Sequence, residues 1–315
     1  MKPNFFIVGA PKCGTTSLAR YLSQHDEVFI STPKEPSYFA RHLWRDEIRP
    51  ELLPFRCELD AYLQLFSEAD HNKHKAVGEG STIYLSSRQA LTEIRELQPA
   101  ARIIVMLRNP VDLAYALHSE CRLHLHEDEE DFETAWSLQE TRRNGNRIPK
   151  GSDRVQSLLY GDMARLGEQL ETVLEIFPRD QVMWIFFDDF KADTGLQYRC
   201  VLEFLELSND GRTAFPVVNQ NQNARPSAVL RILKTNRMLR RASASLKRSF
   251  GVQSWGIVKR LQNRTAETAP RPPLSPALRA EMTQYFAEDV ARLARITGRD
   301  LSGWSSLSQP TLPMQ

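Results

Sequence analysis

Short runs of apolar residues alternate along the chain with longer stretches in which apolar residues recur every three or four positions. Uninterrupted apolar runs are typical of strands buried on both faces, and the longer period indicates helices. Strands are predicted at residues 5–9, 28–30, 102–107 and 182–187. Helices are predicted at residues 15–25, 91–97, 110–122, 158–177, 196–205 and 278–296. This alternation predicts an α/β fold with a mostly parallel central sheet and helices on both faces.

Two stretches depart from the alternation. Residues 123–153 are polar and contain the acidic run 127–131, so we expect a helical insertion with a mobile end. Residues 225–272 contain twelve Lys or Arg and one Glu, which gives this basic segment a charge of +11. Because the whole chain carries +2, the rest of it carries −9, and the charge is segregated.

The composition is that of an ordinary globular protein, with 315 residues, 41% of them hydrophobic and 25% charged. We expect a single domain over residues 1–315. The small net charge gives no reason to expect a nucleic-acid partner. The four cysteines form no CxxC pair and predict neither a disulfide framework nor a metal site. The apolar run at residues 5–8 is too short for a signal peptide or a membrane span, so we expect a soluble, cytoplasmic protein.

A glycine-rich turn joins the first predicted strand to the first predicted helix. The unpaired backbone N–H groups and the dipole of a helix N-terminus attract anions, Lys12 adds a full positive charge, and three hydroxyl side chains follow. The alternative is a plain glycine turn without a ligand. The residues predicted to hold a phosphate here are Pro11, Lys12, Cys13, Gly14, Thr15, Thr16 and Ser17.

This turn differs from a Walker loop in the position of its lysine. The spacing from Gly9 to Gly14 matches that motif, but Thr15 stands where the Walker lysine belongs. The lysine lies inside the loop instead, at Lys12. The pattern therefore argues against a magnesium–triphosphate enzyme and for a different phosphate ester.

The segment FFIVGAPKCGTTSLARYL resembles the 5′-phosphosulfate-binding loop of sulfotransferases that use 3′-phosphoadenosine 5′-phosphosulfate (PAPS). The next segment, SQHDEVFISTPKEPSYF, resembles the bacterial and heparan-sulfate-type branch of that family. The resemblance continues through GEGSTIYL, LRNPVDLAYALHSE, FPRDQVMWIFFDDFKAD and GRDLSGW. It implies a P-loop-like three-layer fold and transfer of a sulfuryl group from PAPS to a hydroxyl or amine. It also implies that PAP is the product and that no metal is needed.

The resemblance assigns binding of the 3′-phosphate to Arg108, which follows the strand predicted at residues 102–107. A guanidinium suits bidentate recognition of phosphate, and open α/β sheets bind ligands at the carboxyl ends of their strands. The alternative is a structural salt bridge. The family usually has a serine eight residues after this arginine. This chain has Ala116 there, so the contact is absent or falls to Ser119 or to the basic segment.

The resemblance assigns the role of general base to Glu35, which removes a proton from the acceptor as the acceptor attacks sulfur. Without the resemblance, a glutamate in an exposed loop would be read as simply solvated. Lys34 would orient the transferring group. Lys12 would stabilise the negative charge that develops on the leaving 5′-phosphate.

The segment at residues 219–234 resembles the C-terminal nucleotide loop of the family. Arg225 and Arg231 are candidate ligands of the 3′-phosphate or the adenine edge, and a solvated basic helix is the alternative interpretation. The family's heparan-type enzymes often have His at the position of Ser37 and Lys at that of Gly80. Both departures argue against a heparan-like polymer, so carbohydrate, lipid and small-molecule acceptors all stay open.

Two other functions compete with sulfuryl transfer. A magnesium-dependent kinase acting on a nucleotide or small molecule is disfavoured by the missing Walker lysine, and Asp188 and Asp189 are the nearest imitation of its metal-binding carboxylates. A basic surface-binding module with a vestigial nucleotide site is the third reading, in which residues 225–272 contact a membrane peripherally. The sequence predicts no oligomeric state.

Overall fold

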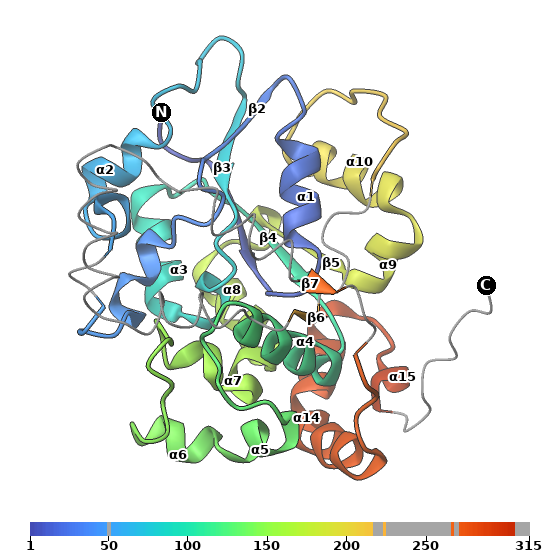
Figure 1. The fold of residues 1–315 in the computed structure, drawn as a ribbon. Coiled ribbons are helices and arrows are strands. Elements are labelled where there is room, and N and C mark those ends of the chain that lie inside the picture. The colour runs from blue at the N-terminus through green and yellow to red at the C-terminus, as the bar shows by residue number, and fades with distance from the viewer. Residues whose placement is uncertain (49–51, 217–222, 225–265, 268–270, 306–315) are drawn as a thin grey trace.

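The computed structural model of this protein describes residues 1–48, 52–216, 223–224, 266–267 and 271–305. Its centre is a five-stranded, all-parallel sheet in the order β2-β3-β1-β4-β5 (Figure 1). The strands are β1 (Phe5–Gly9), β2 (Val28–Ile30), β3 (Ala76–Glu79), β4 (Arg102–Leu107) and β5 (Val182–Phe186). This sheet, with helices around it, confirms the predicted fold class.

The direction of each crossover decides which face of the sheet its helix covers. The chain moves one way across the sheet from β1 to β2 and the other way from β3 to β4 and from β4 to β5. Right-handed crossovers therefore put the helix of the first connection on one face and the helices of the other two on the opposite face. The helices of these connections are α1 (Thr15–Leu22), α3 (Arg88–Leu97), α4 (Pro110–Leu123) and α8 (Leu166–Ile176).

Other helices complete both layers (Figure 1). Tyr21 of α1 lies 6.4 Å, between ring centroids, from Phe190 of α9, so α9 and α10 share the layer of α1. The long helix α14 packs on α8 and α4 in the other layer. The further helices are α2 (Leu59–Gln64), α5 (Phe132–Ser137), α6 (Gln139–Arg143), α7 (Tyr160–Ala164), α9 (Phe187–Ala192), α10 (Thr194–Phe204), α14 (Pro276–Thr297) and α15 (Ser302–Ser305). Short 3₁₀ helices are η1 (Tyr38–Leu43), η3 (Pro54–Arg56), η4 (Tyr84–Ser86), η5 (Gln156–Leu158) and η6 (Arg179–Gln181).

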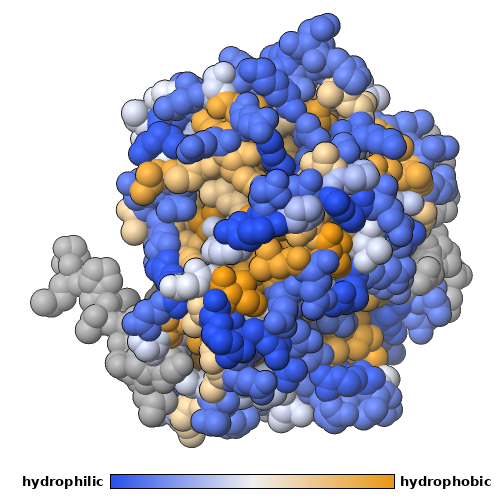
Figure 2. All heavy atoms as spheres, turned by 180° about the vertical axis from the view of Figure 1, so that it is seen from behind, coloured by the Kyte–Doolittle hydropathy of each residue, from blue (hydrophilic) through white to orange (hydrophobic). Residues whose placement is uncertain are grey.

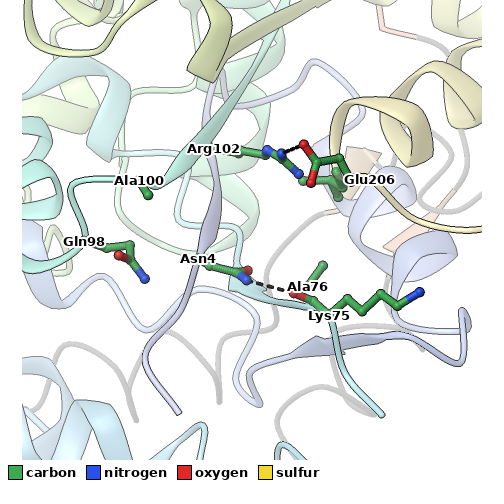
Figure 3. Close-up of a pocket in the computed structure, with 8 residues that line it drawn as sticks. Asn4, Lys75, Ala76, Gln98, Ala100, Arg102 and Glu206 are labelled. Carbon is green, nitrogen blue, oxygen red and sulfur yellow. Dashed lines mark hydrogen bonds and ion pairs between the residues drawn. The ribbon is translucent and has the colours of Figure 1, made fainter. Parts of the chain in front are cut away.

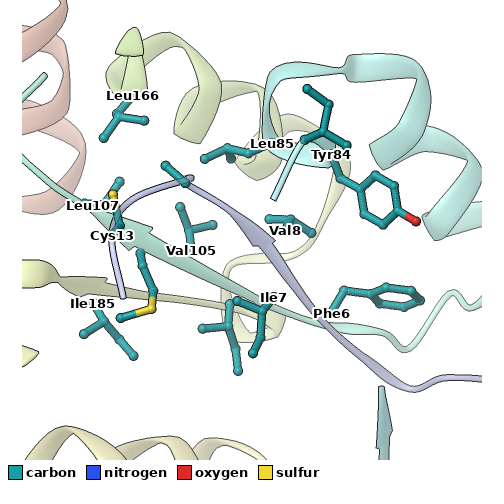
Figure 4. Packing of buried hydrophobic residues seen from close by; sticks show 14 of the residues in the cluster. Phe6, Ile7, Val8, Cys13, Tyr84, Leu85, Val105, Leu107, Leu166 and Ile185 are labelled. Atoms are coloured by element: carbon teal, nitrogen blue, oxygen red, sulfur yellow. The ribbon is translucent and has the colours of Figure 1, made fainter. Parts of the chain in front are cut away.

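The core forms because successive side chains of the central strands point to opposite faces of the sheet and are buried on both. Every residue of β1 is buried. Figure 4 shows Val8 on the side of Leu85 and Leu166, while Ile7 points the other way. Packing between β1 and β3 is so close that a Cβ on Gly78 would lie 2.4 Å from the carbonyl oxygen of Phe5. Glycine is therefore required at that position.

The sequence analysis did not predict β3. Its four residues are all buried between β2 and β1, but the apolar pattern is broken by Gly78 and Glu79. The single helix predicted at residues 158–177 is also wrong, because the structure has η5, α7 and α8 in this range. The break is stabilised by Asp289, whose carboxylate accepts the N–H groups of Gly167 (2.9 Å) and Glu168 (2.8 Å) and so starts a new helix.

Residues 123–153, the predicted helical insertion, contain α5 and α6. A buried ion pair joins Arg142 of α6 to Glu127, with the two charged atoms 2.7 Å apart. The hydroxyl of Tyr160 donates to the same carboxylate at 2.7 Å. Glu127, the first residue of the acidic run, is therefore buried and joins α6 to α7.

The molecular surface carries scattered hydrophobic residues among hydrophilic ones, as the face seen from behind shows (Figure 2). Among the described residues, the large hydrophobic side chains that are exposed to solvent are Leu59, Leu196 and Tyr285. Across the part of the chain that the structure describes, no helix combines the length and the apolar character needed to cross a membrane.

A buried carboxyl group lies at the end of β3. Glu79 is fully buried and accepts hydrogen bonds from the hydroxyls of Tyr62 (2.8 Å), Tyr84 (2.9 Å) and Ser81. Burial raises the pKa of Glu79 to about 7, although the three hydrogen bonds oppose this shift. Glu79 therefore binds its proton more tightly in the folded protein than in the unfolded chain.

We predict that the free energy of unfolding falls as the pH rises from about 4.5 to about 7, because only the unfolded chain then releases this proton readily. Glu79→Gln keeps a neutral side chain at every pH. The free energy of unfolding of the wild type, measured relative to that of this variant, should therefore decrease across that range. Urea unfolding of both proteins at several pH values measures the difference. A difference that does not change with pH would contradict the shift.

Candidate active site

The carboxyl ends of all five strands lie at one edge of the sheet, and the loops that follow β1 and β4 meet there. The chain leaves these two neighbouring strands in opposite directions, and open α/β sheets bind ligands at such a switch point. One guanidinium nitrogen of Arg108, after β4, donates to the carbonyl oxygen of Lys12, after β1, at 2.9 Å. The guanidinium carbon also lies 4.8 Å from the ring centre of Phe187. The structure thus brings the two predicted nucleotide motifs together.

The turn after β1 has the backbone of an anion-binding loop. Lys12 (φ 61°) and Gly14 (φ 91°) are in the left-handed region, and α1 begins directly after Gly14 without a side-chain cap. The first N–H groups of α1 therefore have no capping side chain and face the loop. The thiol of Cys13 is fully buried, and burial raises its pKa to about 12. Cys13 is a neutral anchor for the loop rather than a reactive thiol.

Lys12 has an acidic neighbour on α4. Its ammonium lies 3.4 Å from the carboxylate of Glu120, and both side chains are about one-third exposed. Ion pairs with this exposure contribute little to stability. The Lys12 ammonium therefore remains partly exposed to solvent in a weak ion pair.

Lys34 connects the predicted phosphate loop (residues 9–17) to the candidate base. Its ammonium lies 2.8 Å from a carboxylate oxygen of Glu35 and 3.5 Å from the hydroxyl of Thr16. Gly80 leaves room for this side chain, because a Cβ at that position would lie 2.9 Å from the Lys34 Cε atom. The glycine that replaces the family's lysine thus accommodates a lysine from the neighbouring strand end.

The other end of the site contains an arginine to which the sequence analysis gave no role. Arg271 lies against Tyr115 of α4, with its guanidinium carbon 5.3 Å from the ring centre. Burial lowers the pKa of Arg271, and the nearby charge of Arg108 lowers it further. Two cations thus share one region, as binding of a multiply charged anion requires. The only feature of the sequence that could have pointed to Arg271 is its position as the last basic residue of the basic segment.

Two of the remaining predicted residues, Ala116 and Ser119, lie on α4. Ala116 is buried in the core, and the hydroxyl of Ser119 donates to the carbonyl oxygen of Tyr115 at 3.3 Å. Arg225 and Arg231 are outside the described residues, as is most of the basic segment. The two-residue strands β6 (Asn223–Ala224), just before this segment, and β7 (Ala266–Glu267), within it, pair in antiparallel fashion, and β6 contacts α4.

A polar pocket of about 500 Å³ lies at the opposite edge of the sheet (Figure 3). Its walls come from the amino-terminal ends of β1, β3 and β4, where Arg102 is ion-paired with Glu206 and Asn4 donates to the carbonyl oxygen of Lys75 (2.8 Å). The phosphate loop is at the carboxyl ends of these strands. This pocket is therefore separate from the candidate active site.

Comparison with known proteins identifies the class. The sulfotransferase domain family matches residues 2–293, and this chain belongs to that family. Human carbohydrate sulfotransferase 15 is 33% identical over 152 residues, which cover 36% of this chain and 26% of that protein. The human bifunctional heparan sulfate N-deacetylase/N-sulfotransferase 3 is 26% identical over 210 residues, covering 64% of this chain and 22% of that protein. The chain thus spans about a quarter of the length of these relatives.

A solved structure supports the same assignment. A sulfotransferase from Alicyclobacillus acidocaldarius is 27% identical and has a TM-score of 0.69. The match covers 97% of this chain and all of that one. The family and the fold together place this chain among the sulfotransferase domains.

Proposed function

We propose that this enzyme transfers a sulfuryl group from PAPS to a hydroxyl or amine of a carbohydrate acceptor, with Glu35 as the general base. The observation that carries the proposal is the position of Lys34, between the Thr16 hydroxyl of the phosphate loop and the Glu35 carboxylate. A donor phosphosulfate on the loop and an acceptor at Glu35 would then flank one ammonium group. Relatives named as carbohydrate and heparan sulfate sulfotransferases support a carbohydrate acceptor.

The described residues suit a donor with phosphates at two ends. The loop N–H groups and Lys12 would hold the 5′-phosphosulfate, and Arg108 with Arg271 would hold the 3′-phosphate. As the acceptor oxygen or nitrogen bonds to sulfur, Glu35 accepts its proton and the bond from sulfur to the 5′-phosphate oxygen breaks. Lys12 and the loop N–H groups stabilise the charge left on that phosphate. In this proposal the protein acts without a metal and in the cytoplasm.

The first prediction concerns the nucleotide. PAP should bind to the protein in the presence of a chelator, because protein cations neutralise both phosphates. Arg108→Gln and Arg271→Gln should each weaken binding by about 10- to 100-fold, the range for hydrogen bonds to charged groups. Isothermal titration calorimetry measures this. Binding that requires a divalent metal would contradict the proposed donor site.

Lys12→Ala should reduce turnover by about 10²–10³-fold, because one preorganised charge on the leaving phosphate is lost. The melting temperature should change little, since the Lys12 side chain is partly exposed and its ion pair with Glu120 is weak. Turnover is measured by mass spectrometry with PAPS and a carbohydrate acceptor found by screening. The exposed Lys73, replaced in the same way, is the matched control and should behave as the wild type. Normal turnover in Lys12→Ala would remove Lys12 from the mechanism.

Glu35→Gln should reduce turnover by about 10²–10⁴-fold while PAP affinity stays unchanged, because the variant keeps the shape of the side chain and loses the proton acceptor. Comparing acceptors sharpens the result. Acidic phenols should be less affected than alcohols, which depend more on the base. If turnover is unaffected with every acceptor, another group removes the proton. If PAP affinity falls as well, Glu35 holds the loop together and is not the base.

A further inference from the structure

Two segments distant in sequence meet beside Glu35. The N–H of Arg45 donates to the carbonyl oxygen of Asp153 at 3.1 Å, and its guanidinium donates to the carbonyl oxygen of Pro149 at 3.2 Å. The loop that follows η1 is thereby fixed against the loop that precedes η5.

Trp44 lies at the centre of this junction, and the guanidinium groups of two arginines lie over its ring. It is 5% exposed and packs with Ile48 and Leu52 in a small cluster apart from the main core. The guanidinium carbon of Arg154 lies 4.3 Å from the ring centre of Trp44, and that of Arg56 lies 4.9 Å from it. The indole ring thus holds two like charges close together.

Neither guanidinium has an anionic partner among the residues that the structure describes. The guanidinium of Arg154 forms no hydrogen bond or ion pair with any of them, and its Nη1 atom is buried. The side chain of Arg56 likewise forms neither. Buried nitrogens without a partner are rare in proteins and call for an explanation such as a bound ion or ligand.

The electrostatics relate both arginines to Glu35. Burial lowers the pKa of Arg56, and the charge of Arg154 lowers it further. Burial also lowers the pKa of Arg154. The carboxylates of Asp153 and Glu35 oppose these shifts at both residues, so both guanidiniums lie within the field of the candidate base. Two half-buried cations with so little compensation favour the binding of an anion.

We propose that Arg154 and Arg56, held on Trp44, form a subsite for an anionic group of the acceptor, a carboxylate or a sulfate. The inference rests on the proposed function and extends it by naming the acceptor class. An anion bound by the two planar guanidiniums would separate their like charges and accept their N–H groups. It would also fix a neighbouring acceptor hydroxyl beside Glu35.

The test compares probes that differ in one charge. The probes are para-nitrophenyl β-D-glucuronide, its methyl ester, and the corresponding glucoside sulfated at its primary hydroxyl. Calorimetry with PAP-loaded wild-type protein should show that the glucuronide or the sulfated glucoside binds about 10- to 100-fold more tightly than the ester. Whichever of the two anions gains more identifies the group that the subsite prefers. Equal binding of all three probes would overturn the inference.

Substitutions of the two arginines test whether the preference for anionic probes arises at the subsite. Arg154→Met keeps the apolar stem and should abolish the preference for the anionic probes, while binding of the ester and of PAP stays the same. Its melting temperature should not fall, because the variant removes a buried charge without a partner. Arg56→Gln should reduce the preference and serves as the test if Arg154→Met does not fold. The matched control is Arg88→Gln, an exposed arginine paired with Glu175 on the surface, which should keep the full preference.

The outcomes separate the two proposals. Binding of PAP without any preference for anionic probes contradicts the subsite alone. A preference that persists in both Arg154→Met and Arg56→Gln also contradicts it. If wild-type protein does not bind PAP, the proposed function fails. The same comparison of probes on the protein without PAP then still decides the subsite, because protein residues alone form it.

Discussion

The parallel pairing of β1 with β4 places the two nucleotide motifs at one point. Their hydrogen-bond ladder continues beyond the strand, where the N–H of Ala10 donates to the carbonyl oxygen of Met106 at 2.9 Å. The phosphate loop is thus fixed to β4 as it leaves the sheet, and Arg108 closes the gap by donating to Lys12. Everything else in the candidate site is arranged around this junction. Lys34 arrives from the end of β2, and Arg271 arrives from the segment before α14.

Much of this arrangement could be predicted from the sequence, because its signals are local. The apolar runs at β1 and β4 match the observed bounds, and the glycine-rich turn specifies its own left-handed backbone at Gly14. The strand β3 could not be predicted in this way. Its burial depends on neighbouring strands rather than on its own apolar residues, and Gly78 is needed only because β1 approaches closely.

The long-range members of the site were beyond sequence reasoning for a related physical reason. Arg271 has a partner on α4, and the ring of Trp44 contacts one arginine of η3 and one of the loop before η5. A single sequence contains no periodicity for contacts of this kind. The break between α7 and α8 is a further case, since the carboxylate that starts α8 belongs to Asp289 of α14. In each case a polar group from a distant segment decides the local structure.

The ammonium of Lys34 contacts both the donor loop and the candidate base, so the two halves of the site share one charge. A ligand oxygen on the loop that attracts this ammonium changes the electrostatic free energy of the Glu35 carboxylate. By thermodynamic reciprocity, a ligand at Glu35 that attracts the ammonium changes affinity at the loop by the same factor. A shift of this one side chain toward either ligand would therefore couple the two halves of the site.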